Sequence, residues 1–165
     1  MQVTQRLTPC LWFDDQAEEA AKFYAAIFPN SKIVSMSRYS EAGQDIHRKK
    51  PGSVMTVEFE LNGQTFTALN GGPLFKFNEA ISFQIHCETQ AEIDHYWEKL
   101  GAGGDPKAQQ CGWLKDKFGV SWQVVPRGMA EMLKDSASEG AKRAMGAVMK
   151  MKKLEIAEIQ RAFVG

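Results

Sequence analysis

The chain has 165 residues, in which twenty lysines and arginines balance twenty aspartates and glutamates, so the formal net charge is zero. A neutral chain lacks the basic excess that binding to nucleic-acid phosphates requires, and no stretch of about 18 apolar residues predicts a membrane span. The length fits one domain or two small halves, which would bury roughly two-thirds of the unfolded chain's surface.

The cysteines and the first residues indicate the compartment. Three cysteines, Cys10, Cys87 and Cys111, are widely spaced, so they form neither a disulfide framework nor a CxxC metal motif. Residues 1–6 lack the apolar run of a signal peptide. We therefore expect a cytoplasmic protein with reduced thiols.

The first predicted elements are a strand that ends at Phe13 and an amphipathic helix. Asp15 is placed to cap this helix, with Glu18 at the spacing of a capping box. An apolar stripe at helical spacing follows, made of Ala20, Phe23, Tyr24, Ile27 and Phe28. Strands are predicted at 31–39, 54–61 and 64–70. The long polar loop at 40–52 is interpreted as either a lid or a disordered segment.

The same order of elements repeats in the second half. The segment 15–18 recurs as Thr89-Gln90-Ala91-Glu92, after a strand at 82–87, and the segment 63–67 matches 119–123. Further strands are predicted at 103–109, 111–115 and 120–126. The sequence therefore predicts two βαβββ modules, 1–71 and 72–128, and a helical tail, 129–165, in one compact domain.

Several motifs in this duplicated pattern resemble those of a known family. They are Pro9 to Asp14, Leu61 to Gln64, Asn70 to Pro73, the long run from Cys111 to Pro126, and Met151 to Lys153. With these motifs the chain resembles the PhnB-like branch of the vicinal-oxygen-chelate superfamily, a branch often labelled 3-demethylubiquinone-9 3-methyltransferase. The superfamily includes glyoxalase I, bleomycin-resistance proteins and extradiol dioxygenases. The resemblance implies an α+β fold in which two βαβββ modules form concave mixed sheets, with added C-terminal helices.

Successive side chains of a strand point to opposite faces of its sheet, which selects the residues that could line a cavity. In the second module the polar, concave face is predicted to carry Ser82, Gln84 and His86. The repeat transfers this face to Thr8, Cys10 and Trp12 in the first module. Thr67 is expected to lie opposite Glu58 across the hairpin, and Gln123 is the counterpart of Thr67 in the second module.

The metal-ligand positions of the superfamily can be transferred residue by residue. The resemblance places them at Thr8 (or Pro9), Thr67, Ser82 and Gln123. Hydroxyls and an amide hold a divalent metal poorly, because such metals select imidazole, carboxylate or thiolate donors. We therefore predict no metal cofactor. A displaced metal site that uses Glu58, His86 and Cys10 remains an alternative.

The remaining candidates are a base and an aromatic platform. Glu58 and His86 are the candidate catalytic bases, although the favoured interpretation of His86 is a hydrogen-bonded residue of the cavity wall. Trp12 and Trp113 could stack on a planar ligand, whereas Trp122 is assigned to the core. Cys10 is interpreted as a small wall residue or as a reactive thiol.

Two functions fit these residues. One is a metal-independent binding module that holds a small, partly aromatic molecule. The other is a superfamily enzyme (isomerase, lyase or transferase) with Glu58 or His86 as its base. The methyltransferase named in the family label is disfavoured, because the chain has no GxGxxG turn and its element order does not suit a doubly wound sheet.

The expected partners are a small-molecule ligand and a second copy of the chain. The homodimer is implied by the resemblance, since the open sheets of this superfamily are often completed by a partner subunit. Five methionines of the tail, starting at Met129, supply apolar surface that covers either the partner or the chain's own sheet. Neither a nucleic acid nor a membrane is expected.

Overall fold

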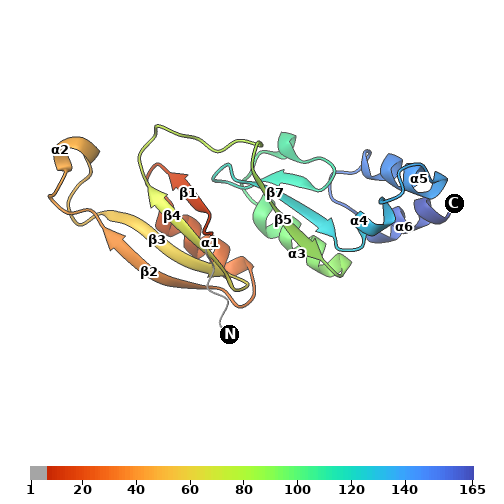
Figure 1. The fold of residues 1–165 in the computed structure, drawn as a ribbon, viewed down its shortest axis with the longest axis horizontal. Coiled ribbons are helices and arrows are strands. Elements are labelled where there is room, and N and C mark those ends of the chain that lie inside the picture. The colour runs from red at the N-terminus through yellow and green to blue at the C-terminus, as the bar shows by residue number, and fades with distance from the viewer. Residues whose placement is uncertain (1–6) are drawn as a thin grey trace. The chain divides into compact units, whose positions relative to one another are not determined.

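The computed structural model describes residues 7–165 and shows two compact units, one ending at Lys76 and the other running from Phe77 to Gly165 (Figure 1). The unit boundary lies a few residues beyond the predicted module boundary, and the C-terminal tail belongs to the second unit. Each unit has its own sheet and is described by itself. Among the described residues, no helix has the length and apolar composition needed to cross a bilayer.

The first unit has the predicted βαβββ order, with one short extra helix. Its elements are β1 (Cys10–Phe13), α1 (Ala17–Ile27), β2 (Lys32–Arg38), α2 (Gln44–His47), β3 (Val54–Leu61) and β4 (Gln64–Asn70). The strands form a sheet in the order β1-β4-β3-β2, in which β1 and β4 are parallel and the other pairs are antiparallel. The polar segment 40–52, predicted to be a loop, contains α2.

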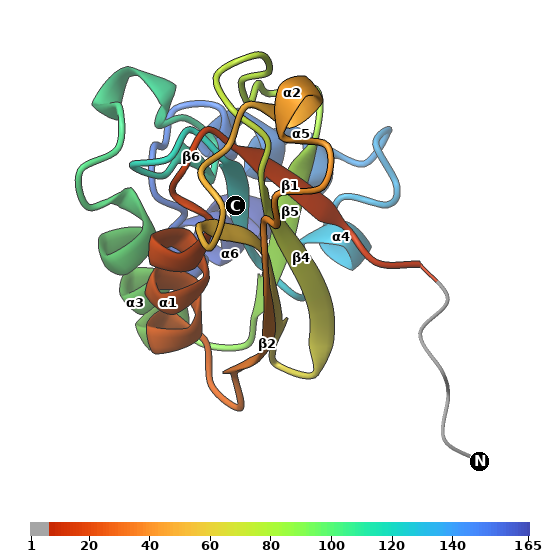
Figure 2. The ribbon, with the colours of Figure 1, turned by 90° about the vertical axis from the view of Figure 1, so that its left-hand side faces the viewer.

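Helix α1 covers one face of this sheet and leaves the other face open. Figure 2 shows α1 along one side of the strands. Its Tyr24 is fully buried and stacks on Phe59, which in turn stacks on Phe66. Phe59 lies in β3 and Phe66 lies in β4. Because successive side chains of a strand point to opposite faces, the residues next to them in each strand point to the open face.

The predicted cap of α1 is wrong. The N-cap residue is Gln16, whose side chain makes no capping hydrogen bond. The amide of Ala17 instead donates to Oδ1 of the buried Asn70, at 2.8 Å, and Nδ2 of Asn70 donates to the carbonyl of Val54 at 3.1 Å. The end of β4 lies beside the end of β1, so Asn70 is close to the first turn of the helix. It therefore accepts the hydrogen bond from the free amide that Asp15 was predicted to bind.

The second unit contains a smaller sheet and most of the helices. Its elements are β5 (Ser82–Cys87), α3 (Gln90–Gly101), the 3-10 helix η1 (Pro106–Ala108), β6 (Trp113–Lys115), β7 (Ser121–Pro126), α4 (Met129–Met132), α5 (Glu139–Val148) and α6 (Ile156–Val164). The strand order is β5-β7-β6, with β5 parallel and β6 antiparallel to β7. The two sheets and their helices confirm the predicted α+β fold.

Two strand predictions in this unit need correction. The strand predicted at 103–109 is wrong, because Asp105 accepts a hydrogen bond from the amide of Lys107 and Pro106 starts the 3-10 helix η1. The strand predicted at 111–115 begins only at Trp113, because Cys111 and Gly112 have φ angles of 52° and 84°. A left-handed pair cannot continue an extended strand.

The capping box predicted for the second helix is confirmed. Oγ1 of Thr89 accepts a hydrogen bond from the amide of Glu92 at 3.2 Å, and the Glu92 carboxylate accepts one from the amide of Thr89 at 3.3 Å. The helix buries Ile93 and Leu100. Here the local sequence suffices, because both partners lie within one turn.

The C-terminal helices pack on the sheet of their own unit. Val125 of β7 lies in a buried cluster with residues of the tail, namely Ala144, Val148, Met151, Leu154 and Ile159. The backbone joins the same parts, since the amides of Cys111 and Gly112 donate to the carbonyls of Met151 and Lys152, both at 2.8 Å. The apolar surface of the tail was predicted to cover either a partner subunit or the chain's own sheet. These contacts support the second interpretation.

Candidate functional site

The open face of the first sheet carries a row of four side chains, one from each strand, of which three belong to predicted site residues. Cys10 on β1 pairs with Thr67 on β4, Thr67 with Glu58 on β3, and Glu58 with Ser35 on β2. The predicted pairing of Thr67 with Glu58 is therefore confirmed. The Ser35 hydroxyl donates to the Glu58 carboxylate at 3.4 Å. Thr8 is exposed and precedes β1.

This row is largely in contact with solvent. Glu58 and Cys10 are exposed, and Thr67 is half-buried. Partial burial raises the pKa of the Cys10 thiol. An activated cysteine needs a lowered pKa, so the geometry does not favour Cys10 as a nucleophile at neutral pH.

Trp12 lies further along the same face and contacts the segment that follows β4. Its indole Nε1 donates to the carbonyl of Gly72 at 2.8 Å, and Phe75 meets its ring edge-to-face with centroids 4.9 Å apart. A Cβ atom added at Gly71 would lie 2.2 Å from the Trp12 ring. The indole therefore packs directly on the Gly71 backbone, which gives Trp12 a structural contact in addition to its predicted role as a stacking surface.

In the second unit the structure joins three of the predicted residues in a hydrogen-bonded group. Nε2 of Gln123 donates to the hydroxyl of Ser82 at 2.8 Å, and Nε2 of Gln84 donates to Oε1 of Gln123 at 3.3 Å. Gln84 and Gln123 are register partners on β5 and β7, and Trp113 on β6 is the partner of Gln123 on the other side. Gln84, Gln123 and Trp113 therefore form one row across the three strands of this sheet, whereas Val125, further along the same face of β7, is buried against the tail.

The two candidate bases lie in different units. Glu58 belongs to the first sheet, whereas His86 is an exposed residue of β5 in the second sheet, paired with Val125. Neither residue lines the cleft or the smaller cavity described below. Their proposed roles as bases remain predictions.

A cleft of about 340 Å³ opens beside β6 and the start of β7. Of the predicted ligand-binding residues, Trp113 lines it. None of the other lining residues was a predicted site residue; they are Glu79, Ala108, Gln110, Cys111, Leu114, Lys115, Ser121 and Met149. The signal that could have found Ser121 is its place as a small polar residue in an otherwise apolar strand, on the face shared with Gln123.

Ser121 is the most unusual group in this cleft. The residue is 1% exposed, and within the described part of the chain its Oγ has no hydrogen-bond partner. A buried hydroxyl without a partner is destabilising by about 1–3 kcal/mol, so such groups call for an explanation. Lys115, the register partner of Ser121, forms an ion pair with Glu79. The hydrogen bond from Lys115 lowers the pKa of the Glu79 carboxyl.

The superfamily's divalent metal does not fit the donors at the transferred positions. Thr8, Thr67 and Ser82 offer only hydroxyls, and the amide of Gln123 is already engaged with Ser82 and Gln84. Within residues 7–165, no three His, Cys, Asp or Glu side chains cluster as metal ligands. The absence of a divalent metal from the working protein remains a prediction.

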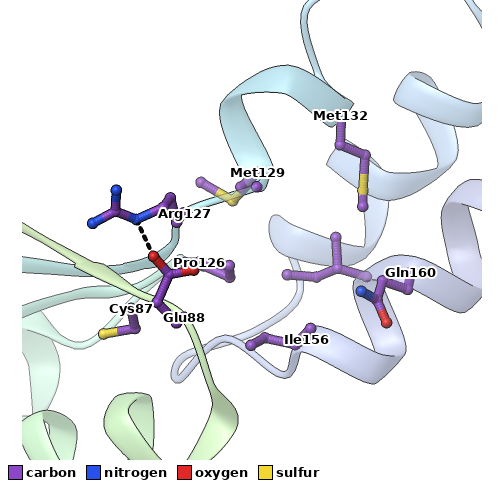
Figure 3. A pocket seen from close by; sticks show the side chains of 10 residues that line it. Cys87, Glu88, Pro126, Arg127, Met129, Met132, Ile156 and Gln160 are labelled. Carbon is purple, nitrogen blue, oxygen red and sulfur yellow. Dashed lines mark ion pairs between the residues drawn. The ribbon is translucent and has the colours of Figure 1, made fainter.

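A smaller cavity of about 110 Å³ lies where the sheet meets the C-terminal helices (Figure 3). Met129, Met132 and Ile156 line it on the helical side, and the ion pair of Arg127 with Glu88 lies at the strand ends. Cys87 also lines it, and burial, with a contribution from the charge of Glu92, raises the pKa of this thiol to about 12. The cavity is mainly apolar, and none of the predicted site residues lines it.

The raised pKa of Cys87 predicts a pH dependence of stability. An unfolded thiol ionises near pH 9 while the folded one stays protonated to about pH 12, so unfolding becomes easier as the pH rises through this window. We expect Cys87 to lower the free energy of unfolding by up to about 1.4 kcal/mol per pH unit. Urea unfolding of the wild type and Cys87→Ala between pH 8 and 11 measures the difference.

The matched control is Cys10→Ala, which removes an exposed thiol. This variant should retain most of the wild-type slope. Equal slopes for the wild type and Cys87→Ala would contradict the prediction, because the titration of lysines and tyrosines is common to both proteins.

The chain is similar to known proteins in both sequence and structure. A family model described as 3-demethylubiquinone-9 3-methyltransferase matches residues 5–125. The PhnB protein from Bacillus cereus is 40% identical, with a TM-score of 0.62, and the match covers 74% of this chain and 99% of that one. No curated protein sequence shows a significant match to the chain.

Two more distant solved structures share the fold alone. A protein from Pseudomonas aeruginosa is 18% identical over 73% of this chain and 96% of its own, with a TM-score of 0.55. The fosfomycin resistance protein FosX from Listeria monocytogenes, solved with Mn(II) and a sulfate ion, is 19% identical over 82% of this chain and 99% of its own, with a TM-score of 0.52.

Proposed function

Because the chain belongs to the 3-demethylubiquinone-9 3-methyltransferase family, the PhnB-like branch of the vicinal-oxygen-chelate superfamily, we propose that it binds a small organic molecule in the cleft beside β6, without a catalytic metal. The observation that carries this proposal is Ser121, which lines the cleft and whose buried hydroxyl has no hydrogen-bond partner among residues 7–165. An oxygen atom of a bound ligand would satisfy that hydroxyl.

The lining residues indicate the class of ligand. The ammonium group of Lys115 has three donors and holds Glu79 with one of them, so it can also donate to a carboxylate or carbonyl oxygen near Ser121. The half-buried Trp113 supplies aromatic surface for a planar group. A volume of about 340 Å³ suits a small ligand. The expected ligand is therefore small and planar, and carries a carboxylate or carbonyl group.

A thermal-shift screen tests the proposal. Small aromatic carboxylates and carbonyl compounds are added to the full chain, with and without divalent metals, because a ligand of the folded state raises the apparent stability. We expect a subset of planar carboxylates to raise the melting temperature equally with and without metal. A shift that appears only with a divalent ion would contradict the metal-independent part of the proposal.

Ser121→Ala then tests the cleft itself. Removing a buried hydroxyl that has no partner should leave the stability unchanged or raise it, while the affinity for the best ligand of the screen falls about tenfold, or roughly 1.4 kcal/mol. Isothermal titration calorimetry measures the affinity, and urea unfolding measures the stability.

Ser82→Ala is the matched control. Ser82 lies on the same sheet face, but its hydroxyl is satisfied by Gln123 and is not among the residues that line the cleft. This variant should bind as the wild type does. A loss of affinity in Ser82→Ala but not in Ser121→Ala would place the ligand elsewhere on the face and refute the assignment to the cleft.

Superfamily enzyme chemistry remains the second candidate, and the row formed by Cys10, Thr67 and Glu58 favours it. In this alternative Glu58 or His86 acts as the base of an isomerase, lyase or transferase. Methyl transfer is not part of the proposal, because both sheets are small and mixed, unlike the doubly wound parallel sheets of the common methyltransferases. The homodimer stays part of the proposal, and sedimentation at high protein concentration measures it.

A further inference from the structure

Two sulfur atoms face each other in the cleft beside β6, and the proposed ligand site uses neither. Sγ of Cys111 and Sδ of Met149 are 3.9 Å apart, and both residues line the cleft. Cys111 is half-buried, whereas Met149 is 56% exposed. The thiol of Cys111 is placed to donate a weak hydrogen bond to the thioether of Met149, which holds the two sulfur atoms together at the edge of the cleft.

The backbone fixes the position of the thiol. Cys111 has a φ of 52°, which a cysteine rarely adopts, and its amide is held by the carbonyl of Met151 at 2.8 Å. The next residue, Gly112, has a φ of 84° and lies so close to β7 that an added Cβ would be 2.9 Å from the carbonyl oxygen of Val124. Strained backbone that the surrounding structure holds in place is often found at functional sites.

The thioether of Met149 belongs to the C-terminal tail, which is hydrogen-bonded to the segment that carries Cys111. Met149 is the C-cap residue of α5, and its amide donates to the carbonyl of Met145 at 3.0 Å. The segment that follows α5 carries the carbonyls of Met151 and Lys152, which bind the amides of Cys111 and Gly112. The two sulfur atoms are thus brought together by hydrogen bonds between the tail and the segment before β6.

An independent observation points to an occupant of the cleft. Ser121, which is 1% exposed, is among the residues that line it, and within the described part of the chain its hydroxyl has no hydrogen-bond partner. Serine is not a ligand for soft metals, so Ser121 is not assigned to the metal. Its unpartnered hydroxyl indicates instead that the cleft is built to hold something besides its own side chains.

We propose that Cys111 and Met149 form a binding site for a monovalent soft metal ion, Cu(I). A thiolate and a thioether select Cu(I) over harder divalent ions. With metal–sulfur distances of about 2.3 Å, a separation of 3.9 Å gives a sulfur–metal–sulfur angle of roughly 120°, as in a three-coordinate site with one position open toward the cleft. Binding exchanges the thiol proton of Cys111 for the metal and leaves a neutral copper–thiolate unit, with no change of oxidation state.

Competition for copper tests the site. The full chain, reduced and kept without oxygen, is titrated into Cu(I) held by a chromophoric chelator, and loss of the chelator colour measures the transfer. We expect one Cu(I) per chain, an affinity about 100-fold lower in Cys111→Ser, and one about 10-fold lower in Met149→Leu, which keeps the apolar volume but removes the sulfur. Copper X-ray absorption should show two sulfur neighbours in the wild type.

Controls separate this site from other thiols and from the proposed ligand site. Cys10→Ser removes an exposed thiol of the first unit and should leave copper binding unchanged. Wild-type affinity in Cys111→Ser or in Met149→Leu overturns the proposal, and so does loss of binding in Cys10→Ser. Failure of the ligand screen does not affect this result, because copper is measured directly.

Discussion

Replacing Asp116 with alanine should lower the free energy of unfolding of the second unit by about 3–5 kcal/mol. Asp116 is 2% exposed, and its carboxylate accepts hydrogen bonds from the amides of Phe118 and Val120, at 2.8 and 3.1 Å, and from Nε1 of Trp122 at 2.8 Å. Alanine would leave all three donors in a buried turn without their acceptor. Urea unfolding followed by tryptophan fluorescence measures the loss.

The matched control is Asp105→Ala. Asp105 also accepts a hydrogen bond from an amide two residues ahead, that of Lys107, but it is exposed to water. Its loss should cost about 1 kcal/mol or less, since water replaces the carboxylate. Similar effects of the two substitutions would contradict the argument that burial makes Asp116 important.

The same turn matters for the cleft. Asp116 follows Lys115 directly and connects β6 to the segment before β7, so its hydrogen bonds set the position of Lys115 opposite Ser121. Asp116→Asn offers a milder test, because it keeps the shape and one acceptor oxygen. We expect intermediate stability from it and weaker ligand binding than in the wild type.

Gly104→Ala should destabilise the second unit by roughly 3 kcal/mol, although it adds a single methyl group. An added Cβ would lie 2.0 Å from the carbonyl oxygen of Lys115. The obstacle is the backbone of β6, which cannot rotate away as a flexible side chain can. Accommodation requires the segment before η1 to move away from β6, which breaks the close packing there. Thermal unfolding compared with the wild type measures the effect.

Gly146→Ala provides the contrast within the same unit. Gly146 lies inside α5, and an added Cβ there would meet nothing within 4 Å. Alanine should therefore stabilise the helix by about 0.5–1 kcal/mol, because glycine loses more backbone entropy on folding. A stable Gly104→Ala protein would show that the segment before η1 does not pack against β6 as described.

Much of the fold was predictable because it depends on neighbours in the sequence. The capping box of Thr89 and Glu92 lies within one helical turn, and alternation along strands placed Gln84 and Gln123 on one face, where they are hydrogen-bonded. The hairpin turn fixed the pairing of Thr67 with Glu58. The 3-10 helix at Pro106 was missed because periodicity is a weak guide over a short polar segment.

The candidate site was less predictable. Trp113 was selected from the sequence and lines the cleft, whereas Ser121, Lys115 and Cys111 were not selected. A serine in a strand is ordinary until the structure shows it buried without a partner, and Lys115 gains its importance from its ion pair with Glu79. Such features depend on how distant segments pack.

The sequence by itself determined the βαβββ order of the first unit, helices α1 and α3, most strands, the faces of the strands, and the family, because these follow from periodicity, turn residues and motifs. Only the tertiary structure decided that Asn70, rather than Asp15, holds the start of α1, that the tail covers its own sheet, and that Cys111 meets Met149. The physical reason is the same in each case. A side chain's partner is chosen by the space and the unsatisfied polar groups around it in the folded chain, and local sequence does not encode either.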